Sequence, residues 1–212
     1  MKKKNGLTLI ELLAVIIILG VLMLVAIPSV TSYINNSRKS AYADTAANYI
    51  KGATNLVNEG VKVQAYDEGV LYMIPVGHDK TKSCVQLESG GQSPYNTEYL
   101  LAYVGVTYNN TKGSYNYFLT AVDGSGQGFK LVSSYKISSS EKNEGSALVE
   151  VGLKNYGSAL QTIYGTTTGD DALYAQTATE GYEATEDTDL KAMMTTAGVN
   201  AMHIFRAASC QS

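Results

Sequence analysis

Residues 7–30 read LTLIELLAVIIILGVLMLVAIPSV, and this stretch decides the fold. Its sixteen residues from Leu12 to Ile27 carry no charge. An α-helix rises about 1.5 Å per residue, so about twenty such residues span the roughly 30 Å hydrocarbon core of a bilayer. The stretch therefore predicts a long helix whose first part crosses a membrane.

The charges around this stretch predict its orientation. Lys2, Lys3 and Lys4 precede it, and no comparable cluster follows it, which places the N-terminus in the cytoplasm and the rest of the chain outside. The whole chain has a net charge of −3, and without the three lysines 13 basic side chains face 19 acidic ones, or −6. Such a chain has no overall electrostatic attraction to nucleic acid. Its charge does not decide whether a local surface binds nucleic acid, and that question stays open.

A small residue lies before the apolar run and not after it. Lys4, Asn5 and Gly6 lead into Leu7, Thr8, Leu9, Ile10 and Glu11, whereas residues 27–30 offer no convincing secretory cleavage site. The arrangement resembles the leader of type IV pilins. The resemblance implies a leader of residues 1–6, cleavage between Gly6 and Leu7 by a prepilin peptidase, and N-methylation of Leu7. The leader and residues 7–30 look most similar to pilins of Gram-positive, clostridia-like bacteria.

Glu11 is the one charge in the apolar segment. A carboxylate inside a membrane costs several kcal/mol unless it is paired or protonated. No Lys, Arg or His lies between Gly6 and Arg38, so we expect no side chain of the segment to serve as its partner. The nearest cation is the amine of Leu7 after cleavage, on a neighbouring copy, and the resemblance implies this assembly role for Glu11 and Leu7. The alternative is that Glu11 snorkels to the cytoplasmic interface.

Pro28 stands at the end of the apolar run. A proline removes one helical hydrogen bond, so we expect either a kink with local unwinding between Gly20 and Pro28 or simply the exit from the membrane. Beyond it, apolar residues recur at helical spacing until Gly60. These residues are Tyr42, Ala46, Tyr49, Ile50, Ala53, Leu56 and Val57. One helix over about residues 7–58 is predicted, with a membrane or filament-core part (7–28) and an amphipathic part (29–60).

Residues 61–212 are predicted to form a globular head. Alternating residues predict antiparallel strands at Tyr99–Thr107, Ser114–Val122 and Phe129–Ile137, with turns at 109–113 and 123–128. We interpret residues 61–93 as a connecting region and residues 187–198 as a short helix that Gly198 ends. The fold class is α+β, a pilin-like long helix packed on an antiparallel sheet.

Cys84 and Cys210 lack the close spacing of a metal or redox centre. The resemblance implies a disulfide that fastens the C-terminus to the sheet, and two free buried thiols are the alternative. His78 with Asp79, and the lone His203, lack a catalytic or metal motif. The acidic residues between Asp170 and Asp189 lack the spacing of an EF-hand. We predict no metal, no cofactor and no enzymatic activity.

Three functions remain in view. The first is a structural subunit of an extracellular type IV pilus, serving adhesion, twitching motility or DNA uptake. The second is a pseudopilin of a type II secretion or competence system, and the third is a membrane-tethered extracellular binding domain. The pilin resemblance implies a single-pass membrane precursor whose partners are other pilin subunits, a prepilin peptidase, an inner-membrane assembly platform and an ATPase.

Overall fold

The structure is a computed structural model, and its chain divides into two compact units, Met1–Ser37 and Arg38–Ser212. It describes residues 8–60, 63, 65–79, 81–87, 91–95, 99–134, 137, 150, 151, 160, 164, 172–175, 183, 184 and 188–210.

Helix α1 (Leu9–Glu59) is continuous over 51 residues. Its residues in the second unit bury one face, on which Tyr42, Tyr49 and Ala53 are fully inaccessible. The amide of Gly60 donates to the carbonyl of Val57 (3.1 Å), and Gly60 has a φ of 66°, a conformation that glycine adopts without strain. The predicted long helix with a stop at Gly60 is confirmed.

A mixed sheet packs on this helix, and in the described part of the chain it has nine strands. They are β1 (Val70–Gly77), β2 (Val85–Gln86), β3 (Tyr99–Asn109), β4 (Ser114–Asp123), β5 (Gln127–Ser133), β6 (Glu150–Val151), β7 (Ala172–Ala175), β8 (Glu183–Ala184) and β9 (Ala201–Ile204). Their order is β6-β5-β4-β3-β1-β9-β7-β8, with β2 beside β1. The pairs β1/β2, β1/β9 and β7/β8 are parallel, and the other pairs are antiparallel. The α+β prediction of a long helix on a mostly antiparallel sheet is confirmed.

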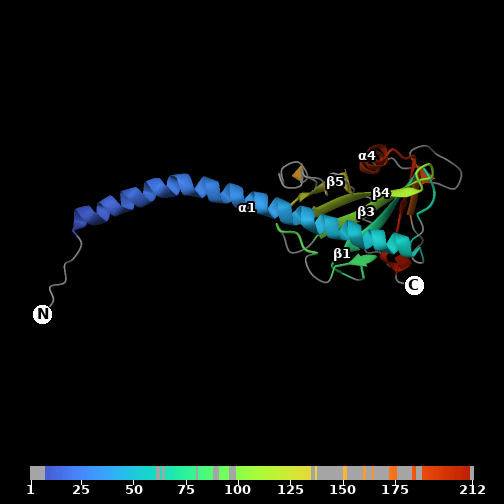
Figure 1. Cartoon of the computed structure of the whole chain (residues 1–212), viewed down its shortest axis with the longest axis horizontal. Coiled ribbons are helices and arrows are strands. Elements are labelled where there is room, and N and C mark those ends of the chain that lie inside the picture. The colour runs from blue at the N-terminus through green and yellow to red at the C-terminus, as the bar shows by residue number, and fades with distance from the viewer. Residues whose placement is uncertain are drawn as a thin grey trace. The chain divides into compact units, whose positions relative to one another are not determined.

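The predicted meander is present as β3, β4 and β5 (Figure 1). The first two strands extend slightly beyond their predicted ends. The third strand was predicted to run to Ile137, and this end is wrong. The pairing of β5 with β4 reaches only Ser133, opposite Phe118, and Ile137 is helical. Gly126 occupies the β4–β5 turn with a φ of 80°, a conformation that glycine adopts without strain, within the turn predicted at 123–128.

The interpretation of residues 61–93 as a connecting region is wrong for β1. All eight residues of this strand are buried, and it lies between β3 and β9. Its even-numbered residues, such as Tyr72 and Ile74, pack in the core beneath α1, and Leu71 and Met73 pack in a second core. A strand buried on both faces shows no apolar–polar alternation, so its periodicity is not informative.

The second core lies under helix α4 (Thr188–Ala197) on the opposite face of the sheet. Leu190, Met193 and Met194 of α4 are fully buried there. The helix ends immediately before Gly198, as predicted, and β9 follows it. The chain then forms the short 3-10 helix η2 (Ala207–Cys210). The sheet is therefore a middle layer between α1 and α4.

Asp123 at the end of β4 fixes a loop against this sheet. Its side chain is fully buried, and Oδ2 accepts a hydrogen bond from the hydroxyl of Ser93. Oδ1 accepts from the amide and hydroxyl of Ser125 (2.9 and 2.6 Å) and from the amide of Gln127 (3.0 Å). Tyr49 of α1 binds the same loop, because its hydroxyl donates to the carbonyl of Gly91 (2.7 Å). The loop thus ties α1 to the β4–β5 turn.

Candidate functional site

The apolar part of α1 is exposed throughout the first unit. Its large hydrophobic side chains from Leu9 to Ile34 are between 42% and 83% accessible. The helix is long and apolar enough to cross a membrane. Soluble proteins rarely expose so large a contiguous apolar surface, so this surface requires lipid or other protein around it.

Glu11 and Thr8 form a reciprocal cap at the start of α1. Oε2 of Glu11 accepts hydrogen bonds from the backbone amide and from the hydroxyl of Thr8, both at 2.8 Å. Oγ1 of Thr8 in turn accepts from the amide of Glu11 at 3.4 Å. This is the capping-box arrangement, in which an N-cap threonine and a glutamate three residues later satisfy each other's backbone donors.

The cap corrects the expectation that no side chain of the segment can serve Glu11. The segment has no cationic side chain, but two neutral donors of Thr8 bind the carboxylate. The signal was present in the sequence as Thr8-x-x-Glu11 before an apolar run. Neutral donors reduce the cost of burying a carboxylate but leave its charge in place. Where lipid or protein covers Glu11, the carboxylate therefore still needs a cation or must be protonated.

Pro28 lies inside α1 and does not end it. Residues 20–28 are helical in this single copy. The hydroxyl of Thr31 donates to the carbonyls of Ile27 and Pro28, both at 3.0 Å. Such bonds from a threonine to the preceding turn often accompany a bend in a helix. Unwinding of this region on assembly stays a prediction.

Gly6 and Leu7, the predicted cleavage and methylation site, lie outside the described residues. The described chain begins at Thr8, one residue after Leu7. Pairing of Glu11 with a Leu7 amine therefore also stays a prediction. The two bonds from Thr8 both use Oε2 of Glu11, so Oε1 is the oxygen that they leave for such an amine.

Cys84 and Cys210 form a disulfide, which confirms the predicted pair over the alternative of two free thiols. The bond joins η2 to the segment between β1 and β2 across 126 residues of sequence. Cys210 is buried, and Cys84 packs at the edge of the core beneath α1. The C-terminus is therefore fastened to the sheet.

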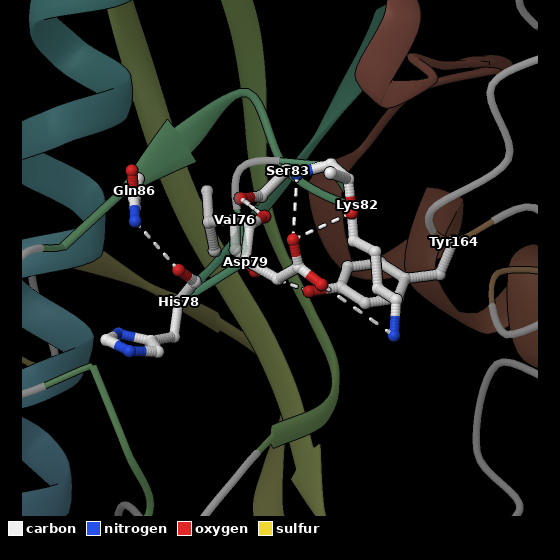
Figure 2. A network of polar contacts seen from close by, with 8 residues as sticks. Val76, His78, Asp79, Lys82, Ser83, Gln86 and Tyr164 are labelled. Atoms are coloured by element: carbon white, nitrogen blue, oxygen red, sulfur yellow. Dashed lines mark hydrogen bonds and ion pairs between the residues drawn. The ribbon is translucent and has the colours of Figure 1, made fainter.

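Hydrogen bonds order the loop that leads to Cys84 (Figure 2). Oδ1 of Asp79 accepts from the amide and hydroxyl of Thr81 (2.8 and 2.7 Å), and Ser83 donates to the carbonyl of Asp79 (2.7 Å). The Thr81 hydroxyl, followed by the Thr81 amide, holds the pKa of Asp79 below its usual value. The Cys84 amide donates to the carbonyl of Pro75 (2.8 Å), so Cys84 is positioned by its own loop.

Among the described residues, neither histidine belongs to a group of three or more His, Cys, Asp or Glu side chains that could hold a metal ion. Nδ1 of His78 lies 3.2 Å from the carbonyl oxygen of Leu87. His203 stacks on Tyr72 and Phe205, with ring centroids 5.6 and 4.5 Å away. Most of the acidic stretch between Asp170 and Asp189 lies outside the described residues.

Comparison with known protein families identifies the start of the chain. Residues 1–27 match the prokaryotic N-terminal methylation motif. No curated protein and no solved structure matches the chain. The motif, the long apolar helix that follows it and the Cys84–Cys210 disulfide are together consistent with a type IV pilin or a pseudopilin-like protein.

Proposed function

We propose that the chain is a structural subunit of an extracellular type IV pilus filament. In this proposal a prepilin peptidase cuts after Gly6 and methylates Leu7, and subunits assemble through α1. Before assembly the precursor crosses the cytoplasmic membrane once, with the C-terminal unit outside. An inner-membrane platform and its ATPase supply the work of extraction, and the subunit itself acts as a building block and not as an enzyme.

The observation that carries the proposal is the exposure of α1 in the first unit. Leaving the membrane would expose its apolar side chains to water, at about 25 cal/mol for each Å². Packing against the same helix of neighbouring copies buries them again. A tether for a binding domain would need the apolar length, but it would not need a carboxylate at Glu11.

Glu11 gives the filament its proposed register. The Thr8 cap holds the carboxylate at the first turn of the helix. Pairing of Glu11 with the Leu7 amine of a neighbouring copy neutralises both charges as water leaves the interface. A buried ion pair contributes little net stability but strongly penalises arrangements in which one partner is left alone. Only one axial offset between adjacent helices then satisfies every subunit.

The experiment compares three forms of the full-length protein expressed in piliated cells: wild type, Glu11→Gln and Glu11→Ala. Glutamine keeps an acceptor for the Thr8 cap and removes the charge, and alanine removes both. We expect wild-type filaments in sheared fractions to begin at methylated Leu7 by mass spectrometry, and we expect both variants to lose most filaments.

Two results would contradict this mechanism. If Glu11→Gln assembles like wild type, the cap suffices and the charge pair with Leu7 is wrong. If wild-type protein stays in the membrane with Lys2 to Lys4 attached and forms no fibre, the filament proposal itself is wrong. Fibres that are short and confined to the envelope would favour the pseudopilin of a secretion or competence system.

A further inference from the structure

The apolar part of α1 ends at an exposed tyrosine. Tyr33 is 75% accessible, and its apolar neighbours Val30 and Ile34 are 54% and 42% accessible. The sequence has no charge between Glu11 and Arg38, so no charged side chain marks the outer end of a membrane span before Arg38. A tyrosine ring is apolar and its hydroxyl is polar, and tyrosine is enriched where lipid meets water. Tyr33 therefore has the chemistry of an outer boundary.

The spacing between Glu11 and Tyr33 matches the thickness of a bilayer. Both side chains are exposed on one continuous helix. Tyr33 follows Glu11 by 22 residues, which at about 1.5 Å per residue is about 33 Å along the helix axis. At the average tilt of about 20° this length projects to about 31 Å, and the hydrocarbon core is roughly 30 Å thick. Glu11 and Tyr33 can therefore lie at opposite boundaries of one bilayer.

The residues just before Tyr33 suit the outer edge of the lipid. Ser29, Thr31 and Ser32 carry hydroxyl groups, whereas the run from Leu12 to Ile27 is almost entirely aliphatic. The hydroxyl of Thr31 donates to the carbonyls of Ile27 and Pro28, so it brings no unsatisfied donor into the lipid. The polarity of the helix thus begins to rise shortly before Tyr33.

We propose that Tyr33 anchors the membrane-inserted precursor at the outer lipid–water interface, with Glu11 at the cytoplasmic interface. The inference rests on the membrane-spanning precursor of the proposed function, and the partner of Tyr33 is the phospholipid headgroup layer. Pro28 then lies about 7.5 Å inside the outer boundary, so it is within the bilayer and does not mark the exit.

This placement separates two stages for Glu11. In the precursor the carboxylate lies next to water, where it needs neither a cation nor a proton. Its need for the Leu7 amine of a neighbouring copy arises only when α1 leaves the bilayer and water is excluded from the filament core. The anchor thus keeps the assembly charge hydrated until assembly.

The chain contains no tryptophan, so one introduced tryptophan is a specific reporter of depth. Tyr33→Trp retains an interfacial aromatic ring and makes it fluorescent. Val21→Trp is the matched control, because Val21 is 62% exposed and lies ten residues, or about 15 Å, from Glu11, near the expected midplane. Each full-length precursor is reconstituted at a low protein-to-lipid ratio in vesicles of phosphatidylcholine and phosphatidylglycerol. A mobility shift of the Cys84–Cys210 disulfide on reduction reports that the C-terminal unit has folded.

Quenching by brominated lipids then measures the depth of each tryptophan. One lipid carries bromine near the headgroup and the other near the end of the acyl chain. We expect the ratio of shallow to deep quenching to be at least about three-fold higher for Tyr33→Trp than for Val21→Trp. If Tyr33→Trp is quenched by neither lipid, or as strongly by the deep lipid as Val21→Trp is, the interfacial position is wrong.

A second pair of variants tests whether Tyr33 sets the depth. Leucine favours lipid, so Tyr33→Leu should let the apolar segment slide toward the cytoplasm and carry position 21 away from the midplane. Combined with Val21→Trp, Tyr33→Leu should lower the ratio of deep to shallow quenching about two-fold, whereas Ile34→Leu should leave it unchanged. An unchanged ratio with Tyr33→Leu would overturn the anchoring role.

Failure of the proposed function gives a different result. If Val21→Trp is quenched by neither lipid, α1 does not cross the bilayer, and the membrane precursor falls together with the anchor. If Val21→Trp is quenched by the deep lipid while Tyr33→Trp is not quenched at the interface, the precursor stands and only the anchor is wrong.

Discussion

The two halves of α1 contain similar apolar residues in opposite surroundings. In the N-terminal unit Leu24 is 78% exposed, whereas in the C-terminal unit Tyr49 is fully buried against the sheet. The difference shows that one half completes a core within its own chain and that the other half has its packing partner elsewhere. Substitutions in the second half should change the stability of the subunit, and those in the first half should change only its association.

The largest effect on stability should come from the disulfide, which closes the C-terminal unit and does not touch the N-terminal one. Its sequence separation of 126 residues gives a chain-entropy estimate of about 4–5 kcal/mol for its contribution. We expect Cys84→Ser with Cys210→Ser to lower the free energy of unfolding by up to that amount, measured by urea titration of full-length protein in detergent micelles. An unchanged unfolding midpoint would show that the hydrogen-bonded loop and η2 hold without the bond.

A matched pair of alanine substitutions compares the two halves of α1 directly. Tyr49→Ala removes a fully buried ring and its hydrogen bond to Gly91, and we expect a loss of about 3–5 kcal/mol. Leu24→Ala should leave the unfolding of the C-terminal unit within about 0.5 kcal/mol of wild type, because Leu24 contacts solvent in the single copy. The same urea titration, followed by near-ultraviolet tyrosine signals, measures both. A large effect of Leu24→Ala on the free energy of unfolding would contradict the claim that the N-terminal half of α1 does not stabilise the C-terminal unit.

Asp123 sharpens the comparison, because it is a buried polar side chain in the C-terminal unit, which completes its own core. Asp123→Ala leaves donors of Ser93, Ser125 and Gln127 without their acceptor, and we expect a loss of about 2–4 kcal/mol. Ser93→Ala removes one of these donors and should cost less. Hydrogen exchange should show the greatest loss of protection in residues 91–95 and 123–127. Uniform loss over the whole sheet would contradict a local role.

The smallest effect concerns the exposed Asp79 loop. Its carboxylate has a pKa below the usual 3.8, chiefly because the Thr81 hydroxyl donates to it. A depressed folded pKa means that the loop is stabilised above pH 3.8 and that this stabilisation is lost as the pH falls through the lower folded value. Thr81→Val should raise the pKa of Asp79 toward 3.8, measured by carboxyl NMR titration of the full-length protein. An unchanged titration would assign the shift to the Thr81 amide alone.

Sequence reasoning succeeded where a residue pattern has one physical cause. The uncharged run from Leu12 to Ile27, the alternation in β3 and β4, and the stop at Gly60 each indicated the element that the structure contains. It failed for β1, because burial on both faces removes the alternation that marks a strand. The sequence also did not predict the position of β9 between β1 and β7, because pairing between strands distant in sequence leaves no local pattern.

The candidate site shows the same division. The position of Glu11 in an apolar helix was evident from the sequence, but its bonds to Thr8 were not predicted, because Thr8 is a neutral partner and the expectation rested on the absence of cations. The Cys84–Cys210 pair was implied by the pilin resemblance and is present.

The place of β9 has a consequence for the order of events during synthesis. β1 emerges from the ribosome early, but its neighbour on one side, β9, begins only at residue 201. The middle of the sheet therefore stays incomplete until residues 201–204 have been translated, and contacts so distant in sequence form slowly. The apolar N-terminal segment is complete much earlier, so in a membrane-anchored precursor its insertion would not have to wait for the sheet to close.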